Sequence, residues 1–260
     1  MNESANTSKS MIAIVLLIGI NLFFSSQIMS QRLWHRQRAP VTFEEFTTLN
    51  SETGLRLVIE FEAGKSHNHP LMVFWIEDTT GNYIHTVYVA ESIAKGYFRY
   101  GDASTGRWLP GNARRPAALP YWGHKRGIRA DDGFYLPTAE SAMPDAVTGP
   151  TPKSNFRLRT TLRDEAADVF YLVMEINQSW DWNRHWHNNR YPGDEHYMTS
   201  SQPAIVYKVK IDLNNLQDYY KMLPVGHSHW SGKTGELFTD LSTITTALDI
   251  TKQIRVKVVH

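Results

Sequence analysis

The sequence predicts an all-β fold, an antiparallel, immunoglobulin-like β-sandwich with one long irregular insertion and an N-terminal hydrophobic helix. Apolar and polar residues alternate with a period of two in about seven segments, as they do in strands buried on one face. Helical periodicity is sparse along the same part of the chain. Strands of this kind stack readily as two facing sheets.

The alternating segments extend over the second half of the chain as well as the first. The pair at 71–78 and 84–89 is joined by a turn in which Gly81 and Asn82 supply the positive φ of a hairpin. Short helices are expected in residues 216–223 and 236–248. The predicted strands are residues 55–62, 71–78, 84–89, 156–162, 169–177, 204–213 and 250–259.

The chain divides into three predicted parts. Residues 1–30 read as a signal peptide or an N-terminal membrane anchor, residues 31–53 as a linker, and residues 54–260 as a single sandwich domain. Within that domain, residues 97–154 are rich in Gly, Pro and Arg and show no strand period, which predicts a long loop. A loop of this length in a compact domain is usually functional or packed as an irregular cap.

The N-terminal segment predicts the compartment. Residues 11–24 are apolar apart from Gly19 and Asn21, a length that suits the apolar region of a signal peptide better than a full membrane span. The basic residues that follow argue against export, whereas the apolar run argues for it. We expect an extracytoplasmic, periplasmic protein, either cleaved or tethered by its hydrophobic N-terminal helix.

Composition narrows the function classes. The chain has 27 basic and 26 acidic residues, so no net field favours a nucleic-acid partner. It has no cysteine, which excludes disulfides, thiolate nucleophiles and cysteine-ligated clusters. No nucleophile–base pair, carboxylate pair or phosphate loop stands out, so we favour a protein that is not an enzyme.

Three His-x-His pairs suggest a metal site. On a strand, residues i and i+2 face the same way, so each pair can direct two imidazoles at one ion, and imidazole without thiolate suits copper or zinc. The alternative is that these histidines hydrogen-bond loop backbone. The candidate metal ligands are His185, His187, His227, His229, His67 and His69.

Residues 180–197 concentrate aromatic rings. Trp180, Trp182 and Trp186 are candidates for stacking on sugar or flavin rings, and they serve equally well to seal one end of the sandwich. A stacking site requires exposed rings, which the sequence does not reveal.

Several short sequence motifs resemble those of a family of predicted periplasmic proteins whose domain has no assigned function. The likeness covers about residues 55–260 and rests on short motifs at 75–89, 113–127, 145–152, 174–183 and 201–207. The family is typically encoded near flavin transferases of the ApbE type and PepSY membrane proteins linked to flavin and iron redox work. The resemblance implies partners among envelope membrane proteins of such a system, or a subunit role in a membrane assembly.

The segment DAVTGPTP also resembles sites at which FMN is attached to a threonine. Asp145, Thr148, Gly149 and Thr151 match that pattern, and Pro150 replaces its alanine. The resemblance implies Thr151 as the point of covalent FMN attachment. The alternative is a Pro/Gly turn that leads into the strand at 156–162.

Three functions remain open at this point. The first is an exported, membrane-tethered or free accessory protein of an envelope redox or metal-handling system. The second is a copper- or zinc-binding protein built on the His-x-His pairs. The third is a carbohydrate- or peptide-binding module that uses the tryptophan-rich segment.

Overall fold

Every segment with alternating polarity contains a strand, and the apolar faces of these strands meet between two sheets. The computed structural model describes residues 42–102, 104–107, 109–162 and 167–259. The first sheet runs in the order β1 (Glu44–Thr48), β8 (Phe156–Leu162), β2 (Leu55–Ala63), β13 (Thr251–Val259), β11 (Tyr220–Lys221). The second runs β12 (Leu223–His227), β10 (Ile205–Asp212), β9 (Val169–Asn177), β3 (Leu71–Glu77), β4 (Tyr83–Ala90), β7 (Thr148–Gly149).

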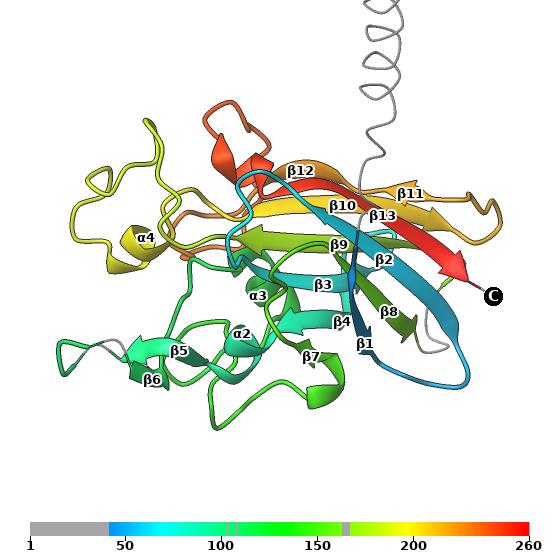
Figure 1. The fold of residues 1–260 in the computed structure, drawn as a ribbon, viewed down its shortest axis with the longest axis horizontal. Helices are drawn as coiled ribbons and strands as arrows, with labels where there is room; N and C mark the ends of the chain where they lie inside the picture. The colour runs from blue at the N-terminus through cyan, green and yellow to red at the C-terminus, as the bar shows by residue number, and fades with distance from the viewer. Residues whose placement is uncertain (1–41, 103, 108, 163–166, 260) are drawn as a thin grey trace, which may run out of the picture. The chain divides into compact units, whose positions relative to one another are not determined.

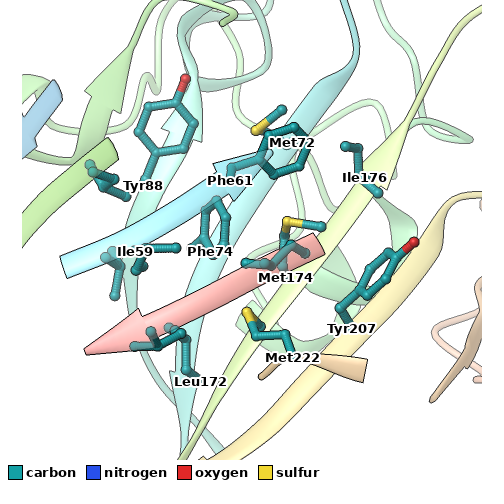
Figure 2. Close-up of a cluster of buried hydrophobic side chains, with 14 of the residues drawn as sticks. Ile59, Phe61, Met72, Phe74, Tyr88, Leu172, Met174, Ile176, Tyr207 and Met222 are labelled. Carbon is teal, nitrogen blue, oxygen red and sulfur yellow. The ribbon is translucent and has the colours of Figure 1, made fainter. Parts of the chain in front are cut away.

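The main core lies between the two sheets, as in a β-sandwich (Figure 1). Ile59 and Phe61 of β2 lie opposite Phe74 of β3 and Met174 of β9, and all four side chains are inaccessible to solvent (Figure 2). Burial of each such side chain contributes about 1.5–3 kcal/mol. The alternation in the sequence therefore supplies the apolar layer that holds the sheets together.

A second core covers the outer face of the second sheet. Strand β3 is buried along its whole length rather than on alternate residues. Val73 and Trp75 on its outer face pack against Leu119 and Trp122, which belong to the cap, defined here as residues 91–147. The cap contains α2 (Glu91–Lys95), β5 (Tyr97–Asp102), β6 (Leu109–Asn112), α3 (Pro120–Arg126) and η1 (Asp145–Val147).

The cap accounts for most of the insertion predicted at 97–154, which is not structureless. Strands β5 and β6 form a separate two-stranded sheet that reaches away from the two main sheets (Figure 1). Helix α3 begins at Pro120 and ends at Arg126, and the next residue, Gly127, has a φ of 74°, the left-handed conformation common after a helix. Apart from this hairpin, the insertion therefore folds against the outer face of the second sheet.

The sheets are mixed, whereas a fully antiparallel sandwich was expected. Strand β1 pairs in parallel with β8, and β7 pairs in parallel with β4. Parallel partners cannot be joined by a tight hairpin, and more than 100 residues separate β1 from β8. Strand β1 also lies inside the segment 31–53 that we expected to be a linker.

Residues 216–223 differ from the prediction of a helix, because they contain β11 and the first residue of β12. Residues 236–248 contain the start of a short 3-10 helix, η2 (Thr246–Asp249). The predicted leader and N-terminal hydrophobic helix lie in residues 1–41, outside the described residues. Along the described part of the chain, no helix has the length and apolarity needed to cross a membrane.

Candidate functional site

The aromatic segment, defined as residues 178–194, connects β9 to helix α4 (Glu195–Ser200) at one end of the second sheet. Its two ends are tied together. The Asn177 side-chain amide donates to Ser200 Oγ at 2.8 Å and to the Gln202 carbonyl at 3.1 Å. Because Asn177 and Ser200 are both buried, these hydrogen bonds hold the two ends of the segment in a fixed position.

Trp180 and Trp182 form an exposed pair at the surface of this segment. Trp180 is 53% exposed and Trp182 is 44% exposed. Their ring centroids lie 5.9 Å apart, and the ring planes meet at 80°. Trp180 has a φ of 64°, a conformation that costs free energy for a bulky residue. The backbone therefore presents two large apolar rings to solvent in a corner-shaped arrangement and accepts strain to do so.

Gln202 is the centre of the hydrogen-bond network beneath the tryptophan corner, the name used here for Trp180 and Trp182. It is 1% exposed. Its amide nitrogen donates to the Asp181 carbonyl at 3.1 Å and to Thr246 Oγ1 at 2.5 Å. Its amide oxygen accepts from the backbone N–H of Thr245 at 2.8 Å. Gln202 thus joins the corner to η2, far away in the sequence.

Asp181 separates the two exposed tryptophans and points inward. Its Oδ1 accepts from Thr246 Oγ1 at 2.5 Å. Its Oδ2 is buried, and no hydrogen-bond partner for it occurs among the residues that the structure describes. Burial raises the pKa of the Asp181 carboxyl, and hydrogen bonds from Thr246 and Gln202 oppose that rise.

Asn183 completes the network. Its Oδ1 accepts the backbone N–H groups of His185 at 2.8 Å and Trp186 at 2.7 Å. Its Nδ2 lies within hydrogen-bonding distance of Gln202 Oε1, the Thr243 carbonyl and Thr245 Oγ1. The amide groups of Asn183 and Gln202 are therefore occupied in holding the corner in place.

Trp186 does not join the exposed pair. It is 4% exposed, its Nε1 donates to Thr243 Oγ1 at 3.1 Å, and its ring contacts those of Tyr197 and Trp230. Of the three tryptophans predicted to stack on a ligand, the structure brings Trp180 and Trp182 together at the surface and places Trp186 in the core.

The predicted metal ligands of this region pack chiefly as rings. His185 and His227 lie on Trp186, with centroid distances of 5.0 and 5.8 Å. His227 also stacks on Phe238, and His229 stacks on Trp230 at 4.2 Å. Burial lowers the pKa values of His227 and His229.

The remaining predicted ligands have other surroundings. His187 is exposed, and its carbonyl accepts from the Tyr197 hydroxyl at 2.8 Å. His67 Nε2 lies 3.2 Å from the Pro152 carbonyl, and His69 Nδ1 lies 3.1 Å from Asn68 Oδ1. Within the described ranges, no three His, Asp or Glu side chains are grouped so that they could hold a metal ion.

The segment predicted to carry FMN forms the outer edge of the second sheet. Asp145 lies in η1, and Thr148 and Gly149 form β7. Gly149 is required there, because a Cβ at this position would lie 2.6 Å from Cε2 of the buried Tyr88 ring. The Tyr88 hydroxyl donates to the Pro150 carbonyl, and Thr151 is half-buried.

Sequence reasoning missed the residues that support the tryptophan corner. Gln202, Thr245 and Thr246 lie 20 to 66 residues from the tryptophans they support. The short motif at 201–207 was the only available signal. A shallow hollow of about 400 Å³ near α4 was also missed; it is lined by Pro192, Gly193, Asp194, Glu195, His196 and Lys233.

Comparisons with protein-family models, with curated proteins and with solved structures found no match, so the resemblance described above stays a prediction.

Proposed function

We propose that this protein is an accessory domain that binds an extended peptide segment of a partner protein through the tryptophan corner. The observation that carries the proposal is the exposure of Trp180 and Trp182 on a strained and heavily hydrogen-bonded loop. Strained backbone and exposed large aromatic rings both occur preferentially at binding sites. The buried network beneath the rings fixes their positions before a ligand arrives, which reduces the entropic cost of binding.

The chemistry of the corner favours an apolar or proline-bearing peptide over a sugar. Sugar sites combine an aromatic ring with free polar side chains, but the amides of Asn183 and Gln202 are already engaged in the network. The two rings are perpendicular, so they do not form the flat platform that stacks on a row of sugar rings. A proline or aliphatic side chain needs only apolar contact and can pack in the angle that two perpendicular rings form.

The proposal includes a place for the domain. We infer that it works outside the cytoplasm, cleaved or tethered, with a partner from an envelope redox system. The N-terminal apolar run and the family resemblance support this placement. An immunoglobulin-like arrangement of the sandwich belongs to the same proposal, and the antiparallel pairing of β2 with β13 and of β3 with β9 and β4 supports it.

Peptide selection tests the proposal. Phage-displayed peptides are selected against the full chain, and the strongest is titrated by calorimetry. We expect selected sequences to share proline or aliphatic residues, and we expect Trp180→Ala and Trp182→Ala each to weaken binding by at least about 30-fold, as for central aromatic contacts. Tyr219→Ala is the matched control, because Tyr219 is an exposed aromatic residue outside the corner.

Two outcomes would overturn the proposal. One is a selected peptide that binds the double variant Trp180→Ala/Trp182→Ala as tightly as it binds the native chain. The other is failure of selection combined with glycan binding that depends on the same two tryptophans, which would assign the corner to carbohydrate. Unchanged thermal unfolding of each variant ensures that a loss of binding reports the site rather than the fold.

A further inference from the structure

The charge of this chain is unevenly distributed, although the whole chain is nearly neutral. Residues 95–129 contain eight basic residues and one acidic residue, Asp102, which leaves 19 basic and 25 acidic residues elsewhere. This stretch of the cap is therefore strongly basic, whereas the whole cap, residues 91–147, has eight basic and six acidic residues. The basic residues are Lys95, Arg99, Arg107, Arg114, Arg115, Lys125, Arg126 and Arg129.

Acidic neighbours neutralise three of these residues. Lys95 pairs with Glu91 at 2.8 Å, Arg114 pairs with Asp132, and Lys125 lies 3.8 Å from the buried Glu77. None of the other five has a carboxylate oxygen within 4.0 Å among the residues for which positions are described. Positive charge in residues 95–129 thus exceeds what direct ion pairs compensate.

The β5–β6 hairpin places part of this excess charge beside exposed apolar side chains. Arg99 and Arg107 are exposed, and so are Tyr97, Tyr100 and Leu109. The Arg99 guanidinium lies 5.5 Å from the centre of the Tyr100 ring. The hairpin reaches away from both main sheets (Figure 1), so these side chains are accessible to a large surface.

Phe98 fixes the hairpin to the domain. Its side chain is buried in the core beneath the cap, and the Arg115 guanidinium lies 4.9 Å from its ring centre. Tyrosine, leucine and arginine on the outside with a phenylalanine on the inside give the hairpin one anchored face and one amphipathic face. Tyrosine and arginine are residues that settle at the boundary between lipid headgroups and acyl chains.

We propose that the β5–β6 hairpin docks on the surface of a bilayer that contains anionic phospholipids. Arginines attract the anionic headgroups, and the exposed tyrosines and leucine enter the interface. A membrane is favoured over a nucleic acid because residues 11–24 are an apolar run of the kind found in signal peptides and membrane anchors. The 17 residues from 25 to 41 span at most about 60 Å, so a bilayer that anchors this run would keep Thr42 within about that distance of its surface.

A fluorescent label on the hairpin tests the proposal in the full chain. The chain has no cysteine, so Thr105→Cys in the loop between β5 and β6 introduces one labelling site for a polarity-sensitive dye. Asn215→Cys, exposed in the loop after β10, is the matched control. Each labelled chain is mixed with vesicles of phosphatidylcholine alone or with one third of the lipid replaced by phosphatidylglycerol.

We expect the emission of the dye at position 105 to shift to the blue with vesicles that contain phosphatidylglycerol, and the dye at position 215 to show no shift. In about 0.5 M NaCl the shift should disappear, because salt then screens charges over a few ångströms. Arg99→Ala/Arg107→Ala should weaken the docking constant by about 25-fold, given about fivefold for each basic residue near an anionic surface. Lys252→Ala/Lys257→Ala, which removes two exposed lysines of β13, should leave it unchanged.

Three results would overturn the proposal. The first is an equal shift at position 105 in neutral and anionic vesicles, which would show that the apolar run alone directs binding. The second is no shift in any vesicle while flotation shows that the chain is bound. The third is a shift produced by a single-stranded oligonucleotide and not by anionic vesicles, which would assign the basic hairpin to nucleic acid. None of these measurements depends on the tryptophan corner.

Discussion

The Glu175 carboxylate of β9 accepts the backbone N–H of Trp122 at 2.8 Å and thereby holds the first turn of α3 against the second sheet. It also accepts the backbone N–H of Tyr121 at 3.1 Å. Glu175 is fully buried, and this burial raises the pKa of its carboxyl to about 7 in spite of these donors. The cap is therefore attached to the sandwich through a group that titrates near neutrality.

Glu175 should make stability depend on pH. The pKa is higher in the folded state than in the unfolded state, so the unfolded chain releases this proton first as the pH rises. Glu175 thus contributes about 3 kcal/mol to the free energy of unfolding below about pH 4.5, and this contribution is lost as the pH rises to about 7. Glu175→Gln cannot titrate, so the native chain should lose stability relative to this variant over that range.

Urea unfolding of both chains at a series of pH values measures this difference. Glu175→Gln is expected to be less stable at low pH by about 1–2 kcal/mol, because its amide nitrogen faces a backbone N–H. The gap should narrow or reverse by pH 8. A gap that stays constant from pH 4.5 to 8 would show that Glu175 is ionised throughout and that burial does not control it.

His227 should have the opposite pH dependence. Burial lowers the pKa of His227, so the folded chain resists the proton that the unfolded chain takes up. The contribution of His227 to the free energy of unfolding is therefore present above the usual histidine pKa of about 6.5 and is lost as the pH falls below that value. His227→Phe keeps a ring against Phe238 and should reduce the loss on acidification from pH 7.5 to 5.5, measured by thermal unfolding. Equal losses in the two chains would contradict this assignment.

The strain at Trp180 can be measured by comparing two substitutions. Glycine adopts a positive φ without penalty, whereas alanine does not, so Trp180→Gly should be about 1 kcal/mol more stable than Trp180→Ala. Trp182 provides the control, because its φ is not positive and glycine there should be less stable than alanine by about 0.5–1 kcal/mol. Denaturant unfolding of the four variants gives both differences. The same order at both positions would refute backbone strain at Trp180.

Gly149 should not tolerate a side chain, although it lies in a surface segment. An added Cβ would lie 2.6 Å from the Tyr88 ring, which is buried and hydrogen-bonded to the Pro150 carbonyl. We expect Gly149→Ala to cost about 1–3 kcal/mol in the free energy of unfolding. In a Tyr88→Leu background the cost should shrink, because a smaller side chain makes room. An unchanged cost would place the obstruction elsewhere.

The sequence predicted those parts of the fold that depend on local chemistry. The turn between β3 and β4 is such a part, because Asp78 Oδ1 accepts from the backbone of Thr80 and Asn82, both at 2.8 Å, and Gly81 has a φ of 87°. All of these residues lie within five positions of one another. The parallel pairing of β1 with β8 depends on contacts across more than 100 residues and leaves no local pattern.

The candidate site was predictable only in part for a related reason. The concentration of aromatic residues at 180–186 identified the right segment, but nothing in the sequence distinguishes an exposed tryptophan from a buried one. Which of them are exposed is decided by the positive φ at Trp180 and by bonds from Gln202 and Thr246. These bonds depend on the tertiary fold, so the burial of Trp186 could not be read from its neighbours.

The burial of β3 on both faces limits how far this protein can be shortened. Replacing residues 91–147 by a tight connection would bring Val73, Trp75 and Val173 into contact with water. An apolar sheet surface laid bare in this way promotes self-association. The smallest version of the protein that stays dispersed in solution must therefore retain the excursion between β4 and β7, even though that stretch was the least regular part of the sequence.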